Sequence, residues 1–418
     1  MPGPAPKLTS EGIQQIKEIV NAAVANPKQD IPGLSVSISN TKGEDLLTYA
    51  HGKVGCDSDK EITTDSMFWI ASCTKMLTTV SVMQLVEKGL LKLDDADHLE
   101  RIIPELKSLP IISLNEDGSL NLRKKKNQIT LRHLLTHTAG FGYKFFNPEI
   151  NTYLDFYNID EFQLTHEAQF LTPLLFEPGT QFNYGLSIDV AGLALERVTN
   201  QKLGNYVKEH IYEPLGLTTS SFTPNAQLLE KLVHLHERDV KTGELKEREH
   251  ILYATDLKNG FEYVHSGGAG SFSKPRNYVQ FLATLMNDGV CPITGARILK
   301  KETIDEMFVN QIPEMPDFGR RKLTALDGLS YNITDLYPQE GNPPQGWGLS
   351  FFINLTPLPT GRSAGSGFWC GLSNVFYWFD RETGITGMVA AQILPFPDPK
   401  TFKAWADIET VVYQSLQN

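Results

Sequence analysis

The sequence predicts an α+β fold: an antiparallel sheet built from both ends of the chain, flanked by helices, with a helical subdomain inserted between its two halves. Strand patterns occupy residues 31–50 and 348–392, whereas residues 64–217 have mostly helical patterns. Helices are also predicted at both termini, where they can cover one face of the sheet. We expect three sections that form one unit, residues 1–63, 64–260 and 261–418, with a cleft between the sheet and the helical subdomain.

The N-terminal section begins with an amphipathic helix over residues 10–26, opened by Ser10 as its capping residue. Two strands follow at 31–39 and 45–50, and the Lys42-Gly43 turn between them is typical of a hairpin. The C-terminal section has three predicted strands and a final helix, at residues 348–353, 373–379, 387–392 and 399–417. Residues 381–384 form the turn before the third of these strands. Residues 311–346, rich in Pro and Gly, are expected to be a surface excursion near the stretch 367–371.

The composition is that of a globular protein with a substantial core, because hydrophobic residues make up 41% and charged residues 21% of the 418 positions. The net charge of −11 argues against nucleic acid or an anionic membrane as the main partner. No apolar run reaches the roughly 18 residues that a bilayer crossing needs, and the N-terminus lacks a signal-peptide pattern. The four cysteines show no metal-binding or disulfide spacing. We therefore expect a soluble, cytoplasmic protein.

The strongest functional signal is Ser72-Cys73-Thr74-Lys75. Residues 76–89 have the pattern of a helix closed by glycine, so Ser72 is predicted at the start of a helix with Lys75 one turn later, beside it. A serine hydroxyl becomes a nucleophile when a base takes its proton, and burial can lower the pKa of a lysine enough to help. The helix N-terminus also favours a developing negative charge. The pair is a candidate for acyl transfer, although a capping serine followed by a solvated lysine has the same pattern.

Three further stretches accompany this motif: Ile129–Gly140 (ITLRHLLTHTAG), Glu177–Gly185 (EPGTQFNYG) and Gly367–Gly371 (GFWCG). With them, the chain resembles the serine β-lactamase-like superfamily from about Ile31 to its C-terminus, in particular the class C and esterase branch. Within that branch it is similar to fungal transesterases of the lovastatin acyltransferase type. The resemblance implies a β-lactamase/transpeptidase-like fold whose residues 64–260 carry the catalytic groups.

The resemblance also implies roles for individual residues. Ser72 would be the acylated nucleophile, Lys75 would share its proton, and Tyr184 would be the partner base. That last role requires neighbouring cations to stabilise a phenolate. The backbone N–H groups of Ser72 and Leu372 would form the oxyanion hole, and a shift in register would put Gly371 in place of Leu372.

Two departures from the class C pattern bear on the substrate. Leu186 replaces an asparagine, and Trp369-Cys370-Gly371 replaces Lys-Thr-Gly, so an uncharged ester or thioester is expected rather than a β-lactam. Trp369 and Cys370 are candidate substrate-binding residues, together with Gly268 of the glycine-rich stretch 265–271. Tyr143 and Phe146 are further candidates from the aromatic stretch 141–175, which core packing explains as well as a wall over an apolar pocket does.

These features predict a serine acyltransferase that forms a covalent acyl-enzyme and moves an acyl group from an ester or thioester to an alcohol of a secondary metabolite. It would need no cofactor and would act as a monomer. A carboxylesterase is the main alternative, followed by a β-lactamase and a non-catalytic binding protein. The basic cluster Arg123–Lys126 is interpreted as a solvated loop before a helix, or as a docking point for an acyl-carrier protein that donates the acyl group.

Other motifs are set aside on their context. Ser363 lies in a G-x-S-x-G sequence, but a strand pattern follows it where a nucleophile elbow needs a helix, so a turn residue is expected. His133 and His137 are four residues apart without the glutamate of a zinc helix, and we expect packing or capping roles for them. His234 and His236 lack a third ligand. The sequence therefore predicts no metal site.

Overall fold

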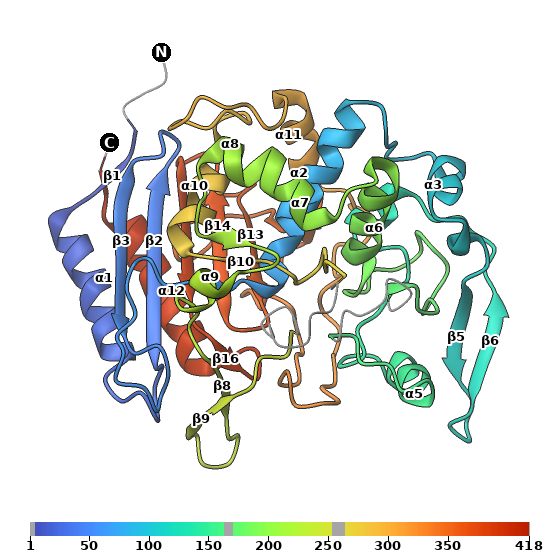
Figure 1. Cartoon of the computed structure of the whole chain (residues 1–418), viewed down its shortest axis with the longest axis horizontal. Helices are drawn as coiled ribbons and strands as arrows, with labels where there is room; N and C mark the ends of the chain where they lie inside the picture. The colour runs from blue at the N-terminus through green and yellow to red at the C-terminus, as the bar shows by residue number, and fades with distance from the viewer. Residues whose placement is uncertain (1–4, 163–169, 253–263, 418) are drawn as a thin grey trace.

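The computed structural model describes residues 5–162, 170–252 and 264–417, and its largest sheet has seven strands, all antiparallel, in the order β11-β12-β13-β14-β15-β2-β3 (Figure 1). Their bounds are β2 Gly33–Asn40, β3 Asp45–Gly52, β11 Gln345–Trp347, β12 Phe352–Asn354, β13 Gly367–Gly371, β14 Val375–Asp380 and β15 Ile385–Ala390. β15 pairs with β2 from Ile385–Asn40 to Ala390–Ser35. The two ends of the chain therefore meet inside one sheet, as the sequence predicts.

Helices cover both faces of this sheet. They are α1 (Ser10–Ala23), α10 (Pro275–Met286) and α12 (Pro399–Gln414). Neighbouring residues of a strand point to opposite faces. Phe376 of β14 stacks on Trp405 of α12 with ring centroids 4.7 Å apart, whereas the next residue, Tyr377, packs on Tyr278 of α10 at 5.2 Å. The helices α12 and α10 therefore lie on opposite faces.

The predicted cap of α1 is wrong by one residue. The side chain of Thr9, not that of Ser10, accepts the N–H of Gly12, so Ser10 is the first residue of the helix. α1 packs alongside α12, and both termini lie at the same end of the molecule (Figure 1).

The helical part lies beside the sheet (Figure 1). Its centre is α2 (Thr74–Glu87), which follows the short 3₁₀ turn η1 (Ala71–Cys73) and is buried on all sides from Thr74 to Leu85. A helix that is buried all round belongs to the core, so the Ser72 motif rests on a fixed element. The other helices are α3 Ala96–Ile102, η2 Pro104–Lys107, α4 Leu131–Leu135, α5 Pro148–Phe156, α6 Ser187–Thr199, α7 Leu203–Val207, η4 Lys208–Tyr212, α8 Glu213–Leu215, α9 Ala226–Leu229 and α11 Lys301–Phe308.

Smaller sheets surround this frame. They are the pair β1 (Lys7–Leu8) and β17 (Leu416–Gln417), the hairpin β5 (Pro110–Leu114) and β6 (Leu120–Lys124), the set β4 (Phe68–Trp69), β10 (Phe272–Ser273) and β7 (Ser220–Ser221), and the set β16 (Ile393–Leu394), β8 (Leu235–Arg238) and β9 (Leu245–Arg248). The hairpin β5–β6 is not predicted by the sequence. None of the helices in the described ranges has both the length and the apolar character that a bilayer crossing requires.

One further expectation needs correction, and another concerns residues that the structure does not describe. The strand predicted at 348–353 begins only at Phe352, because Ser350 adopts a left-handed backbone conformation with φ of 73° that a strand does not allow. The predicted section boundary at residue 260 falls outside the described residues.

Candidate active site

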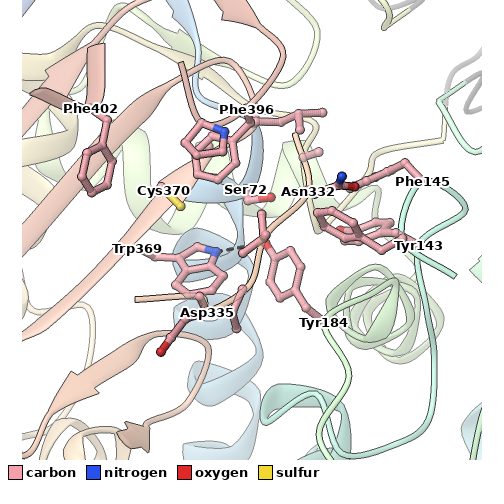
Figure 2. A pocket seen from close by; sticks show the side chains of 18 of the residues that line it. Ser72, Tyr143, Phe145, Tyr184, Asn332, Asp335, Trp369, Cys370, Phe396 and Phe402 are labelled. Carbon is pink, nitrogen blue, oxygen red and sulfur yellow. Dashed lines mark hydrogen bonds between the residues drawn. The ribbon is translucent and has the colours of Figure 1, made fainter. Parts of the chain in front are cut away.

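Ser72 lies in the turn η1 at the entrance of α2, at the wall of a cavity (Figure 2). The residue before it, Ala71, has φ of 43°. A non-glycine residue in this region carries strain of order 1–3 kcal/mol, and such strain gathers at functional sites. The side chain of Ser72 is half-buried, whereas that of Lys75, one turn along the helix, is fully buried.

Lys75 makes three close polar contacts. Its Nζ lies 3.1 Å from the Ser72 hydroxyl, 2.9 Å from the Tyr143 hydroxyl and 2.9 Å from the Gly268 carbonyl oxygen. Burial lowers the pKa of Lys75 to about 8, although the negative charge of Asp189 opposes this shift. A neutral amine has two N–H donors and one lone pair. The three contacts match the three N–H donors of a protonated Lys75. Once deprotonated, the amine keeps two donors for Tyr143 and Gly268, and its lone pair can accept the proton of Ser72.

Tyr184 is a further close neighbour of Lys75. The Lys75 Nζ is 4.7 Å from the centre of the Tyr184 ring, and the indole N–H of Trp369 donates to the Tyr184 hydroxyl at 2.9 Å (Figure 2). Burial raises the pKa of Tyr184 well above its usual value, and the neighbouring Ser72 and Trp369 oppose that shift only in part. Burial therefore favours the neutral phenol in the resting site, and the role of Tyr184 as the partner base stays a prediction.

Asp189 of α6 is a site residue that sequence reasoning missed. Its Oδ1 accepts the Ser266 hydroxyl at 2.5 Å and the Gly268 N–H at 2.9 Å, and its side chain is buried. It therefore holds the loop whose Gly268 carbonyl accepts from Lys75. The available signal was that Asp189 stands alone as a charged residue among the buried positions 187–195 of α6. Gly268 bonds Lys75 and Asp189 and is not among the residues that line the cavity, and its contact with substrate stays a prediction.

The end of β13 lies against η1, beside Ser72. A Cβ atom at Gly371 would be only 2.6 Å from the carbonyl oxygen of Ile70, so only glycine allows this approach. The next N–H group, that of Leu372, has no backbone acceptor in the described ranges. Gly371, Leu372 and Ser72 all line the cavity. The structure thus brings the three predicted backbone groups together at one point.

The cavity has a volume of about 420 Å³. The predicted substrate-binding residues Tyr143, Phe146, Trp369 and Cys370 line it. Tyr143 and Phe146, which come from the aromatic stretch 141–175, therefore form part of the pocket wall. Residues 332–336 and Pro338 line it as well, so the excursion at 311–346 reaches the cavity beside residues 369–371. Asp335 holds this segment, since its carboxylate lies 3.5 Å from Arg320 and accepts from Gln345 at 3.1 Å.

The basic cluster at 123–126 is a loop only in part, and Arg123, Lys124 and Lys126 are exposed. Arg123 and Lys124 belong to β6. Arg123 forms an ion pair with Glu177 at 2.6 Å, and Lys125, whose side chain is 6% exposed, lies 3.6 Å from Glu100. Half of the cluster is therefore neutralised by neighbouring carboxylates.

The histidines and Ser363 have structural partners. The ring Nδ1 of His133 accepts the Thr130 N–H in a capping box at the start of α4. His137 is buried against the ring of Tyr184, with centroids 4.6 Å apart, and burial lowers its pKa well below the usual value. Ser363 lies in the loop before β13, where its N–H donates to Asp380.

Among the described residues, one group of side chains is close enough to share a metal ion: Cys56, His236 and Glu247. However, the Nε2 of His236 faces the Cys56 N–H at 3.0 Å, and its Nδ1 faces the Gln392 carbonyl at 3.0 Å. His234 pairs with Glu247 at 2.9 Å. Since both nitrogens of His236 are in use, these residues form a hydrogen-bond network rather than a ligand set.

Comparison with known proteins agrees with this geometry. The sequence matches the Beta-lactamase family over residues 14–411. It is 27% identical over 404 residues to monacolin J acid methylbutanoyltransferase of Aspergillus terreus, covering 93% of each chain, and 31% identical over 342 residues to lovastatin esterase of Penicillium rubens, covering 79% of this chain and 81% of that one. The fold is similar to simvastatin synthase of Aspergillus terreus (LovD6 mutant), with a TM-score of 0.80, 27% identity and coverage of 97% and 98%. The chain therefore belongs to the Beta-lactamase family, and it is an enzyme of the acyltransferase and esterase group within that family.

Proposed function

We propose that the protein is a serine acyltransferase that takes an acyl group from an ester or thioester onto Ser72 and passes it to an alcohol. The contact between the Ser72 hydroxyl and the buried Lys75 amine, at 3.1 Å, is the observation that carries this proposal. Relatives named as acyltransferases support transfer as the reaction. All the proposed groups belong to one chain, so we propose a monomer as the working unit.

The proposed reaction has two half-reactions. In the first, neutral Lys75 takes the proton of Ser72 as Oγ forms a bond to the substrate carbonyl carbon. The N–H groups of Ser72 and Leu372 bind the carbonyl oxygen as it becomes negative. The bond from that carbon to the leaving thiol or alcohol then breaks, Tyr184 gives its proton to the leaving atom, and Lys75 returns the proton to Tyr184. In the second, an acceptor alcohol enters and the same proton transfers run in reverse.

The donor that we propose is a small ester or thioester. Because Arg123 and Lys125 are paired with Glu177 and Glu100, the basic cluster leaves Lys124 and Lys126 facing solvent, a weak surface for an acidic acyl-carrier protein. A carboxylesterase is a second candidate, since two relatives are named esterases. The two differ only in whether an alcohol or water resolves the acyl-enzyme.

The test is the intact mass of the protein after brief exposure to butanoyl-N-acetylcysteamine, with Ser72→Ala as the control. We expect the wild type alone to gain one butanoyl group and to lose it faster to added alcohols than to water. Loss to water at an equal rate would make the protein an esterase. No adduct and no turnover would exclude the acyl-enzyme.

A further inference from the structure

The turn that carries Leu372 is joined by hydrogen bonds to the segment that leads into Ser72. Residues 372–374 form this turn between β13 and β14, and Trp69 ends β4, just before the turn η1 that holds Ser72. The hydroxyl of Ser373 donates to the Trp69 carbonyl oxygen at 2.8 Å. The two segments that supply the proposed oxyanion donors are therefore linked directly, beside Leu372.

Gln392 strengthens this link with its side-chain amide. Its Oε1 accepts the Trp69 N–H at 3.2 Å, and its Nε2 donates to the Trp69 carbonyl oxygen at 3.0 Å. The side chain therefore binds the N–H and the C=O of one residue, as the opposite residue of an antiparallel strand does. The same Nε2 lies 3.2 Å from the Ser373 hydroxyl oxygen, which can accept from it.

The link is buried, and its position is fixed from a third segment. Trp69 and Ser373 are 0% exposed and Gln392 is 1% exposed, so water does not compete for these hydrogen bonds. The carbonyl oxygen of Gln392 accepts from the backbone N–H and from the ring Nδ1 of His236, both at 3.0 Å. The main chain of Gln392 is therefore held by β8, and its amide satisfies the Trp69 N–H in one orientation only, with Oε1 toward it.

These hydrogen bonds complement the close contact between Gly371 and the Ile70 carbonyl oxygen. A steric contact limits how near two segments can come, whereas hydrogen bonds limit how far they can move apart. Two N–H groups stabilise an oxyanion together only when both lie about 2.7–3.1 Å from it. A displacement of about 1 Å can lower a rate about 10²-fold. The distance between the N–H groups of Ser72 and Leu372 is therefore a quantity that the link can control.

Resting on the proposed function, we propose that Gln392 and Ser373 are positioning residues of the oxyanion hole. Neither of them lines the cavity. Both act through Trp69 on the segment that leads into Ser72, and through the turn at 372–374 on the Leu372 N–H. Loss of either side chain should let the two donors move apart and weaken their hydrogen bonds to the oxyanion.

The first experiment replaces Gln392 by methionine, which has a similar length and shape but no amide. In Gln392→Met, kcat/KM for butanoyl-N-acetylcysteamine should fall by about 10–10²-fold, because both donors remain but are displaced. Ser373→Ala is a milder change and should lower kcat/KM by about three- to tenfold, since Gln392 still binds Trp69. An unchanged kcat/KM in both variants would overturn the proposal.

Gln84→Met is the matched control. Gln84 is a buried residue of α2, and its Nε2 donates to the Ile298 carbonyl oxygen at 3.0 Å. It is absent from the cavity lining. This change should lower the free energy of unfolding in urea, as Gln392→Met should, but it should leave kcat/KM unchanged. An equal loss of kcat/KM in this control would show that activity follows stability alone, and would also overturn the proposal.

The second experiment measures the oxyanion hole directly, with 1,1,1-trifluoro-2-pentanone. The Ser72 Oγ forms a bond to the ketone carbon, the Ser72 proton passes to Lys75, and the ketone oxygen becomes a hemiketal oxyanion. The ¹⁹F chemical shift followed against pH gives the pKa of the hemiketal hydroxyl. Hydrogen bonds to an oxyanion lower the pKa of the hydroxyl from which it forms. Gln392→Met should therefore raise this pKa, whereas Gln84→Met should not.

The outcomes separate the positioning role from the proposed function. A lower kcat/KM in Gln392→Met with an unchanged hemiketal pKa would mean that Gln392 acts on another step, and would overturn the proposal. If the wild type gains no butanoyl group by intact mass, the proposed function fails instead, because Ser72 then forms no acyl-enzyme.

Discussion

Lys75 is an amine that the fold keeps away from water. Its side chain is fully buried, and burial lowers its pKa to about 8. The unfolded chain binds a proton at this lysine up to about pH 10.4, its ordinary pKa. Between pH 8 and that value the unfolded state therefore holds more protons than the folded state, so Lys75 makes stability rise with pH across this window. Below about pH 8, the folded protein carries a charged Lys75 in its interior, which lowers its stability. This loss of stability is consistent with a residue kept for function rather than for stability.

The same pKa predicts the pH dependence of acylation. Because the neutral form of Lys75 takes the Ser72 proton, kcat/KM for a thioester should rise as pH increases and level off above about pH 8. Lys75→Ala should lower kcat/KM by about 10²–10⁴ and remove this rise. The measurement is the rate of thiol release between pH 6 and 9.5, corrected for spontaneous hydrolysis. A profile that falls through this range would exclude the neutral amine as the base.

Trp369 has a hydrogen-bonding role as well as a place in the cavity wall. Its indole N–H donates to Tyr184, while its ring packs edge-on against Trp347 at 4.7 Å. Trp369→Phe removes the donor and keeps an aromatic ring, so we expect kcat to fall about three- to tenfold, the usual value of one net hydrogen bond. In a Tyr184→Phe background the same change should have no further effect on kcat. Equal effects in both backgrounds would show that the indole acts through packing alone.

At the scale of elements, the site depends on the contact between β13 and η1. The end of β13, an inner strand of the main sheet, approaches the nucleophile turn at Gly371, where a side chain would meet the backbone of Ile70. This approach places the Leu372 N–H beside Ser72. Neither element forms the proposed oxyanion hole alone, so its geometry is set by how the sheet packs on the helical part.

Gly371→Ala tests this dependence. The added methyl would lie 2.6 Å from the Ile70 carbonyl oxygen, so β13 must move away from η1. We expect kcat to fall about 10²–10³, the loss typical of one oxyanion donor. The control is Gly346→Ala in β11 of the same sheet, where the added methyl lies 2.8 Å from the movable side chain of Leu355 and 3.2 Å from the Ile353 carbonyl oxygen, a milder backbone contact than at Gly371. Comparable activity of the two variants would argue against a role for this contact.

The sequence predicted the elements whose signals are local. Alternation of apolar residues and the Lys42-Gly43 turn identified β2 and β3, and the glycine-closed helix after Ser72 identified α2. What it could not predict depends on distant partners. Nothing near Asp335 in the chain reveals that Arg320 and Gln345 hold it over the cavity, and nothing near Lys125 reveals Glu100. The role of Asp189 likewise depends on its hydrogen bond with Gly268, which lies far along the chain.

At the scale of the whole molecule, the two ends of the chain pack against each other beside the main sheet. α1 packs on α12, and a Cβ atom at Gly12 of α1 would overlap the Cβ atom of Ser415 just after α12. The backbone N–H of Thr9 also donates to the Ser415 carbonyl oxygen at 3.0 Å. This junction is remote from Ser72, so it should contribute to stability without contributing to catalysis.

The variant Gly12→Ala distinguishes the effect of helix propensity on stability from the effect of the packing between Gly12 and Ser415. Propensity alone predicts that alanine stabilises α1 by up to about 1 kcal/mol, whereas the overlap with Ser415 predicts a net loss of about 1–3 kcal/mol. We expect the loss, measured as the free energy of unfolding in urea, with kcat unchanged at temperatures where the variant is folded. Adding Ser415→Gly removes the opposing Cβ atom and should restore most of the stability. A stabilised single variant would mean that the two helices separate easily, and that the ends of the chain are not held together as the structure shows.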